Sequence, residues 1–221
     1  MSLIKLFLGR TKSGKSYQAN KMLKKRSKAI VYDYAHCFTS GKVYSINVKN
    51  LSKLLRNHGG VKNKSKKYSL IFRKENSMSH QDALDLVALF AQKLGESYGV
   101  RALPENDLIA FVIDEVDKCS TKKDSDRVRL AVQAGRHQNL STWAIAQRPT
   151  RVHPDIRANV TEIRAFPLAG GDRWYEDTLS KKAVEKLNNS DKKYSFLFWN
   201  DEGELKLINS KGGVDHDFNK E

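Results

Sequence analysis

Hydrophobic residues along this chain gather in short runs that alternate with amphipathic stretches. Two runs, Leu3–Leu8 and Leu108–Ile113, are almost continuously apolar, and each stops at polar or glycine residues. This pattern is typical of strands buried on both faces of a parallel sheet. Between them, residues 81–98 place apolar side chains every three or four positions. That spacing predicts a helix with one buried face.

The rest of the chain continues this alternation. We expect further strands over 29–34, 68–72, 142–146 and 161–166, helices over 16–26, 51–56, 125–134 and 178–187, and a C-terminal hairpin built from 194–199 and 204–208. Such an order predicts an α/β fold with a central, mostly parallel sheet flanked by helices. We found no internal repeat or linker, so we expect one domain over 1–209 and a polar, frayed tail over 210–221.

The first strand runs into a loop that has the chemistry of a phosphate site. Gly9–Ser16 matches the pattern G-x-x-x-x-G-K-[ST], and a helix is expected to start near Lys15. Glycines let the backbone N–H groups turn inward around an anion, and the helix start adds its positive end. We therefore expect Lys15 to reach the β- and γ-phosphates of ATP and Ser16 to bind Mg²⁺. The residues expected to hold the nucleotide are Gly9, Arg10, Thr11, Lys12, Ser13, Gly14, Lys15, Ser16 and Tyr17.

A second acidic element follows the most hydrophobic strand. Leu108–Ile113 ends in Asp114 and Glu115. We expect this strand to lie beside the first one, so that Asp114 helps to hold Mg²⁺ next to the phosphate loop. Glu115 can then orient the attacking water as general base. Asp117 is a weaker candidate for the same work.

Residues 135–149 form the next informative block, with Arg136 before a buried strand and Gln147 directly after it. Together with Gly9–Ser16 and Asp114-Glu115, this block resembles the FtsK–HerA superfamily of DNA-pumping P-loop ATPases, over roughly residues 4–166. Within that group, the small size resembles the genome-packaging ATPases of double-stranded DNA viruses with an internal membrane. The chain differs in having Lys12 where relatives often have glycine.

The resemblance implies an ASCE/RecA-like fold and two further catalytic residues. Gln147 would be the sensor residue beside the γ-phosphate. Arg136 would be the arginine finger that reaches the nucleotide of a neighbouring subunit, which implies a ring or another oligomer. Four other arginines remain alternatives for the finger, namely Arg127, Arg129, Arg148 and Arg151.

The charge of the chain adds a partner. Lys and Arg number 40 against 25 Asp and Glu, a formal net charge of +15. Such a charge indicates a polyanionic partner, either nucleic acid, which we favour, or an anionic membrane face. We expect the Lys-rich loop over 62–67 to contact DNA phosphates, and the basic residues over 21–28 to form a solvated helix face. The two cysteines, Cys37 and Cys119, have no metal-ligand spacing, and no run of residues is apolar enough for a membrane span.

These observations predict an ATP-driven motor that moves double-stranded DNA, most specifically a viral genome into a preformed capsid. The implied partners are double-stranded DNA, further copies of the chain in a hexameric ring, and portal or packaging-vertex proteins. The implied location is the host cytoplasm or the packaging vertex of a virion, without a transmembrane segment. Two alternatives stay open: a Zot-like phage assembly or export ATPase, and a non-motor nucleotide-binding regulator that docks on DNA.

Overall fold

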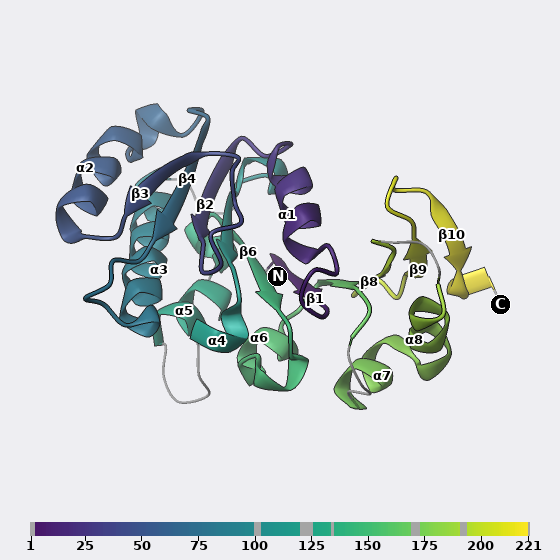
Figure 1. The fold of residues 1–221 in the computed structure, drawn as a ribbon. Coiled ribbons are helices and arrows are strands. Elements are labelled where there is room, and N and C mark those ends of the chain that lie inside the picture. The colour runs from purple at the N-terminus through teal and green to yellow at the C-terminus, as the bar shows by residue number, and fades with distance from the viewer. Residues whose placement is uncertain are drawn as a thin grey trace.

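A computed structural model describes residues 3–99, 103–119, 126–133, 135–168, 173–190 and 194–220. Within these ranges, ten strands form one sheet in the order β10-β9-β8-β7-β1-β6-β5-β2-β4-β3 (Figure 1). The strands are β1 (Leu3–Leu8), β2 (Lys28–Tyr32), β3 (Lys42–Ser45), β4 (Tyr68–Arg73), β5 (Ile109–Ile113), β6 (Leu140–Ala146), β7 (Glu162–Ala165), β8 (Phe196–Asn200), β9 (Leu205–Ile208) and β10 (Val214–Asp217).

The sheet has a parallel part and an antiparallel part. From β3 to β7 all neighbouring strands are parallel, whereas β8, β9 and β10 each pair antiparallel to the strand before them. The prediction of a mostly parallel α/β sheet with a C-terminal hairpin is thereby confirmed. Because parallel strands share one direction, their carboxyl ends meet at a single edge of the sheet, where ligands bind in such folds.

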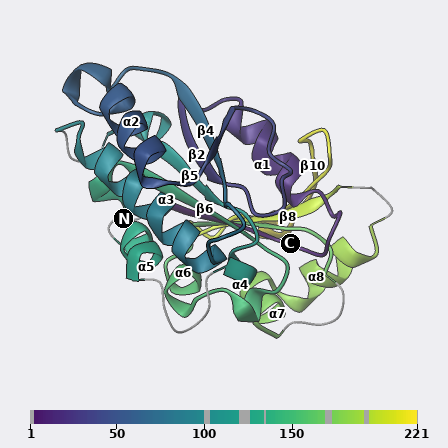
Figure 2. The same cartoon turned by 60° about the vertical axis from the view of Figure 1, so that its left-hand side comes forward.

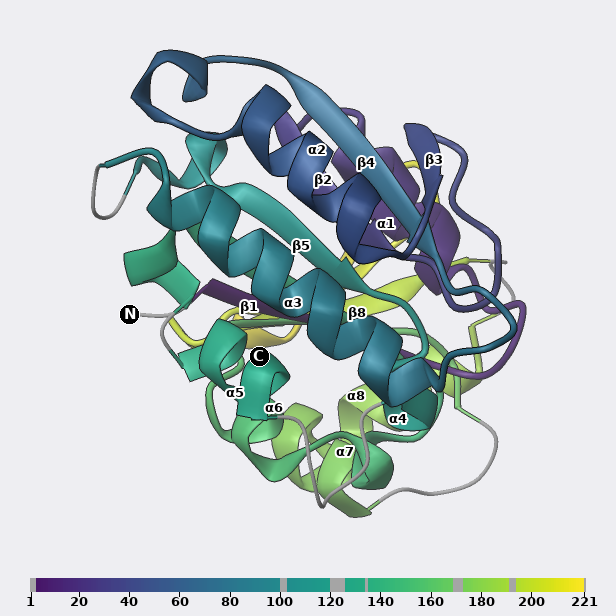
Figure 3. The same ribbon diagram turned by 90° about the vertical axis from the view of Figure 1, so that its left-hand side faces the viewer.

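Helices cover the two faces of the sheet unequally. They are α1 (Lys15–Leu23), α2 (Val48–His58), α3 (His80–Glu96), α4 (Val116–Cys119), α5 (Asp126–Gln133), α6 (Pro154–Ala158), α7 (Arg173–Leu179) and α8 (Lys181–Asn188). The larger apolar core includes side chains of α2, α3, α5, α7 and α8, whereas the smaller core on the other face includes those of α1. Figure 3 shows α3 in front of the sheet and α1 behind it.

One expected neighbour relation is wrong. The strand that ends in Asp114 does not lie beside β1, because β6 lies between β1 and β5. The local hydrophobic pattern of a buried strand does not specify its position in the sheet, so the sequence could not settle this order. The consequence is functional, since the end of β6 brings Gln147 between the phosphate loop and the acidic pair.

Three further elements differ from the sequence-based expectation. The helix expected over 178–187 is two helices, α7 and α8, divided at Ser180, whose φ of 64° breaks a right-handed helix. The short edge strand β3 was not predicted, because its mostly exposed residues lack an apolar pattern. The segment over 210–221, expected to be frayed, contains β10, which pairs with β9.

None of the helices in the part of the chain that the structure describes is both long enough and apolar enough to cross a membrane. The longest, α3, is instead a helix with one buried face. Its side chains at Leu84, Val87 and Leu94 are fully buried, while Lys93 and Glu96 pair at the surface.

Candidate nucleotide site

The phosphate loop joins β1 to α1 at the carboxyl edge of the sheet. Gly9 and Gly14 have φ values of 152° and 110°, which side chains rarely adopt. A Cβ on Gly9 would lie 2.6 Å from the Cβ of Phe166, and one on Gly14 would lie 2.9 Å from the ring of Tyr194. Both positions therefore require glycine for backbone conformation and for space.

Lys12 also adopts a left-handed conformation, with a φ of 62°. Its side chain is exposed. For a residue with a Cβ the left-handed region costs about 1–2 kcal/mol. The backbone at Lys12 therefore has a conformation that suits glycine better than lysine.

Lys15 is buried at the start of α1 and bends back over the loop. Its Nζ donates hydrogen bonds to the carbonyl oxygens of Gly9 at 2.7 Å and Arg10 at 3.0 Å. Burial lowers the pKa of its amine, and the nearby carboxylates of Glu115 and Asp114 act in the opposite direction. The ammonium group is therefore held against the loop, from where it can exchange carbonyl partners for phosphate oxygens.

Asp114 follows β5 and is fully buried. One carboxylate oxygen, Oδ2, accepts a hydrogen bond from the backbone N–H of Ala35 at 2.9 Å and lies 3.7 Å from the Sγ of Cys37. The other, Oδ1, is buried and has no hydrogen-bond partner among the described residues. Burial raises the pKa of this carboxyl group to about 6, and the hydrogen bond from Ala35 acts against that rise.

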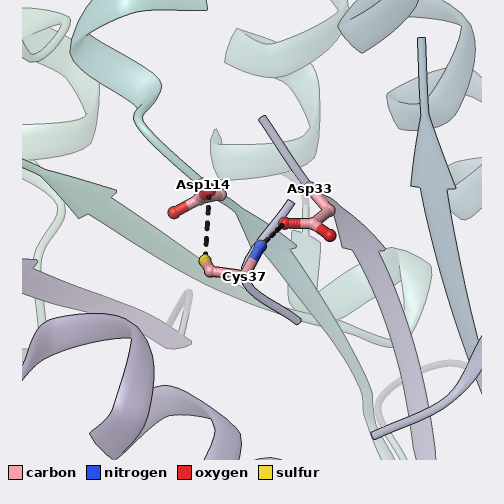
Figure 4. Close-up of side chains that lie close together, drawn as sticks. All are labelled: Asp33, Cys37 and Asp114. Atoms are coloured by element: carbon pink, nitrogen blue, oxygen red, sulfur yellow. Dashed lines mark hydrogen bonds between the residues drawn. The ribbon is translucent and has the colours of Figure 1, made fainter. Parts of the chain in front are cut away.

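Asp33, Cys37 and Asp114 form a compact group whose candidate ligand atoms lie within 4.8 Å of one another (Figure 4). Asp33 accepts hydrogen bonds from the Cys37 backbone N–H at 2.9 Å and from Arg73 Nε at 2.9 Å. Burial and the charge of Asp114 raise the pKa of the Cys37 thiol to about 12. With Asp33 bound to Arg73 and the thiol protonated, Asp114 is the member of the group whose oxygen is left to bind a cation.

These residues fit a Mg²⁺ ion. The ion prefers oxygen ligands, and a buried carboxylate oxygen without a partner is costly unless a cation or donor meets it. Asp114 Oδ1 is such an atom, and Ser16, at the start of α1, lines the same cavity as the phosphate loop. Ser16 and Asp114 could therefore serve as ligands, and their assignment to Mg²⁺ stays a prediction.

Glu115 lies beside Asp114 and is bound by a residue from the next strand. Gln147 Nε2 donates to both of its carboxylate oxygens, at 2.9 and 2.8 Å, and Lys118 Nζ lies 3.0 Å from Oε2. Glu115 has a φ of 51°, a left-handed conformation that non-glycine residues rarely adopt outside functional sites. The residue expected to act as general base is therefore held in a strained backbone conformation, with its carboxylate engaged by two donors.

Gln147 connects this carboxylate to the phosphate loop. Its Oε1 accepts a hydrogen bond from the Thr11 hydroxyl at 3.1 Å, while its Nε2 donates to Glu115. Its backbone N–H and that of Arg148 both donate to the buried carboxylate of Asp117. Asp117 thus fixes the end of β6, and we assign it to positioning Gln147 rather than to binding a cation.

A cavity of about 840 Å³ opens over the loop. Besides residues 11–17, its lining includes Ala35, Cys37 and Glu115, together with Tyr194 and Ser210 from the C-terminal part of the chain. The rings of Tyr17 and Tyr194 stack with centroids 6.1 Å apart and an angle of 25° between planes. Tyr194 and Ser210 carry no motif, so only their position in space identifies them.

Arg136 lies away from this cavity. Its backbone belongs to the 3₁₀ helix Gly135–Gln138, which directly precedes β6 and so lies at the amino edge of the sheet. Its side chain lies outside the described part of the chain, as does that of Arg127. Arg148 and Arg151, by contrast, are exposed after β6, at the same edge as the phosphate loop.

No protein-family model and no curated protein sequence matches the chain. Solved structures do match its fold. The genome packaging NTPase B204 from Sulfolobus turreted icosahedral virus 2 is 22% identical, with a TM-score of 0.67 over 93% of this chain and 95% of that chain. B204 from Sulfolobus turreted icosahedral virus, a DNA-packaging ATPase, is 18% identical, with a TM-score of 0.62 over 98% and 100%.

A bacterial structure has a more distant likeness. EssC (ATPases 2 and 3) from Geobacillus thermodenitrificans is 11% identical, with a TM-score of 0.53 over 97% of this chain and 41% of that one. The chain therefore has the fold of P-loop NTPases, as the resemblance stated from the sequence predicts.

Proposed function

We propose that the chain is an ATPase that drives double-stranded DNA, most specifically a viral genome, into a preformed capsid. The observation that carries the proposal is the placement of Glu115 beside the phosphate loop, with Gln147 bound to both. A protein that only binds nucleotide needs the phosphate loop alone. A general base hydrogen-bonded to a sensor residue is expected in a protein that hydrolyses ATP.

The residues divide the chemistry among themselves. The backbone N–H groups of Gly9–Ser16 bind the phosphates of ATP, and Lys15 leaves the loop carbonyls to reach the β- and γ-phosphates. Ser16 and Asp114 would hold Mg²⁺, and the bound ion would supply positive charge to the phosphate oxygens. Glu115 accepts a proton from the attacking water once its carboxylate is released from Gln147, and Gln147 then turns toward the γ-phosphate.

Arg136 completes the site from another copy of the chain. Its helix lies at the amino edge of the sheet, so it is unsuited to its own nucleotide at the carboxyl edge. A guanidinium supplied by a neighbour would stabilise transition-state charge and couple hydrolysis around a hexameric ring. Arg148 and Arg151 remain alternatives for this finger, because both are exposed beside the nucleotide site.

The net charge and the fold support DNA and a capsid as the partners. The net charge of +15 suits a polyanion, and the two viral structures of similar fold are described as a genome packaging NTPase and a DNA-packaging ATPase. The remaining partners proposed are portal or packaging-vertex proteins, and the proposed location is the host cytoplasm or the packaging vertex of the virion.

The test is ATP hydrolysis measured with and without duplex DNA. We expect Mg²⁺-dependent hydrolysis that duplex DNA stimulates, and no hydrolysis by Lys15→Ala. Nucleotide binding without turnover would favour a regulator instead, and hydrolysis that neither duplex nor single-stranded DNA stimulates would contradict a DNA motor.

A further inference from the structure

A strongly basic groove lies on the face of the sheet that α1 covers. It has a volume of about 500 Å³ and is lined both by residues of α1 and by the turn that joins β9 to β10. Figure 2 shows the ribbons of these two elements beside each other. One carboxylate, that of Glu105, lines this groove. We call it the basic groove and define it by its cations: Lys5, Lys21, Lys25, Arg26, Arg164 and Lys211.

Two of these cations have acidic partners. The buried carboxylate of Glu162 forms ion pairs with both Lys5 and Arg164, and Lys5 Nζ also lies 3.7 Å from a carboxylate oxygen of Glu105. The side chains of Lys21, Lys25 and Lys211, in contrast, have no ion-pair partner among the described residues. The excess positive charge of the basic groove therefore comes from these three lysines and from Arg26.

Arg26 is the unusual member of the set. Its guanidinium lies over the ring of the buried Trp143, with 5.7 Å between Cζ and the ring centroid. Nη1 makes a long hydrogen bond of 3.5 Å to Asn106 Oδ1. Nε and Nη2 are buried and have no hydrogen-bond partner in the described part of the chain. Because a guanidinium stays protonated in proteins, donors buried in this way cost free energy unless an acceptor meets them.

The two atoms without partners form one edge of the guanidinium. Nε–H and an Nη2–H point in parallel, and this fork matches two oxygens of a phosphate or carboxylate group. The residue as a whole is only half-buried, so a rotation of its side-chain torsions can turn this edge into the groove. Lys21 and Lys25, four residues apart, repel one another unless an anion lies between them.

We propose that the basic groove binds the phosphodiester backbone of DNA, with Arg26 as a bidentate phosphate ligand and Lys25 and Lys211 as flanking contacts. The inference rests on the proposed function, because that function supplies the polyanion. It differs from the expectation that the basic residues over 21–28 form a solvated helix face, which the structure contradicts at Lys28, buried in β2. Backbone contacts of this kind are independent of base sequence, as movement along DNA requires.

The groove is also placed to respond to the nucleotide. Helix α1 begins at Lys15, in the phosphate site, and the chain reaches Lys25 and Arg26 in the turn that follows it. Lys21 lines the basic groove and also a second cavity that contains Ser16. A shift of α1 on phosphate binding would therefore move the cations that hold DNA.

The experiment measures the affinity of the full chain for a fluorescent 30-base-pair duplex at several salt concentrations. We expect Lys25→Glu and Lys211→Glu each to weaken binding about tenfold and to lower the slope of log affinity against log salt by about one or two. Arg26→Gln should weaken binding to a similar extent. All three variants should keep their ATP hydrolysis without DNA and lose its stimulation by DNA.

Matched variants separate the outcomes. Lys53→Glu makes the same charge change at an exposed position of α2 and should leave affinity within twofold, whereas Lys64→Glu tests the loop over 62–67. If the groove variants bind DNA as tightly as the unmodified chain while Lys64→Glu binds it more weakly, this inference is overturned. The proposed function as a DNA motor would still stand. Absence of DNA binding by the unmodified chain would overturn both. A third outcome is that Lys15→Ala still binds nucleotide and that the double variant Lys15→Ala/Arg26→Gln does not. That result would overturn the inference, because it would show that the groove binds nucleotide instead of DNA.

Discussion

Gln147 Nε2 donates hydrogen bonds to both carboxylate oxygens of Glu115, at 2.9 and 2.8 Å. In this arrangement the amide occupies lone pairs that a general base needs for water. The same amide carries Oε1, which accepts from the Thr11 hydroxyl of the phosphate loop. The side chain of Gln147 thus contacts both the phosphate loop and the proposed general base, so it can link the state of the loop to the position of Glu115.

Replacing Glu115 by Gln should abolish turnover and preserve nucleotide binding. The amide cannot accept the proton of the attacking water, so we expect kcat to fall by about 10²–10⁴ with little change in the Kd for ATP. Single-turnover hydrolysis and equilibrium binding measure the two effects. Glu105→Gln, at an acid remote from the phosphate loop, is the control, and a parental kcat in Glu115→Gln would remove this residue as the base.

Mixing two inactive variants tests the finger. Arg136→Ala should lower kcat by about 10³ because the transition-state charge loses its guanidinium, and Lys15→Ala should be inactive because it loses a phosphate ligand. In mixed oligomers, a subunit that keeps Lys15 can lie next to a subunit that keeps Arg136. The mixture should therefore hydrolyse ATP faster than the summed rates of the two variants measured separately. A simple sum would argue against action between subunits, and the same mixing with Arg148→Ala or Arg151→Ala tests the alternatives.

Lys12→Gly should stabilise the chain. The residue has a φ of 62° and an exposed side chain, so removing its Cβ relieves about 1 kcal/mol of backbone strain, less the entropy that glycine adds to the unfolded state. Denaturant unfolding measures the difference. Lys24→Gly is the matched control, since its φ of −58° is helical and we expect the opposite sign there. A loss of stability in Lys12→Gly would contradict the strain.

Asp114→Asn should stabilise the nucleotide-free chain in a manner that depends on pH. The folded pKa of this carboxyl group is raised to about 6 from 3.8, so the unfolded chain releases its proton first. Stability of the parent therefore falls as pH rises from about 4 to 6, and the amide avoids that loss. We expect a gain of about 1–3 kcal/mol at pH 7.5 and none below about pH 4.

Urea unfolding in EDTA across this pH range checks the Asp114 prediction. A gain in Asp114→Asn that persisted below pH 4 would mean that its cause is packing rather than the buried charge.

Gly95→Ala should displace the segment that carries Arg136. A Cβ at this position of α3 would lie 1.9 Å from the carbonyl oxygen of Gln138, a clash that can be relieved only by moving backbone. We expect a loss of about 2 kcal/mol or more in unfolding free energy and reduced hydrolysis. Gly135→Ala, whose Cβ would meet its nearest neighbour at 3.6 Å, should be tolerated, and equal stability of the two variants would contradict the clash.

The phosphate loop and the acidic pair could be predicted because each consists of consecutive residues that form a recognisable motif. Gly9–Ser16 and Asp114-Glu115 need only a strand before them, and apolar runs indicate those strands well. The insertion of β6 between β1 and β5 could not be predicted, since pairing depends on distant partners rather than on local pattern. The resemblance implied a sensor role for Gln147, but its contact with Glu115 was not predicted.

The C-terminal contributions were harder to foresee for the same reason. Tyr194 and Ser210 line the nucleotide cavity without any local motif, and β10 has too few apolar residues to suggest a strand. The basic groove is a further case. The sequence shows its lysines as a basic cluster. The burial of one edge of the Arg26 guanidinium depends on packing against Trp143, which the sequence does not show.

The position of β1 within the sheet has a consequence for how the chain folds. This strand is synthesised before the two strands that flank it, because it pairs with β6 and β7, more than 130 residues later. The phosphate loop therefore remains without its neighbouring strands until β6 and β7 have been synthesised. Contacts of such long sequence separation slow folding, so the nucleotide cavity can form only after Glu162–Ala165 has left the ribosome.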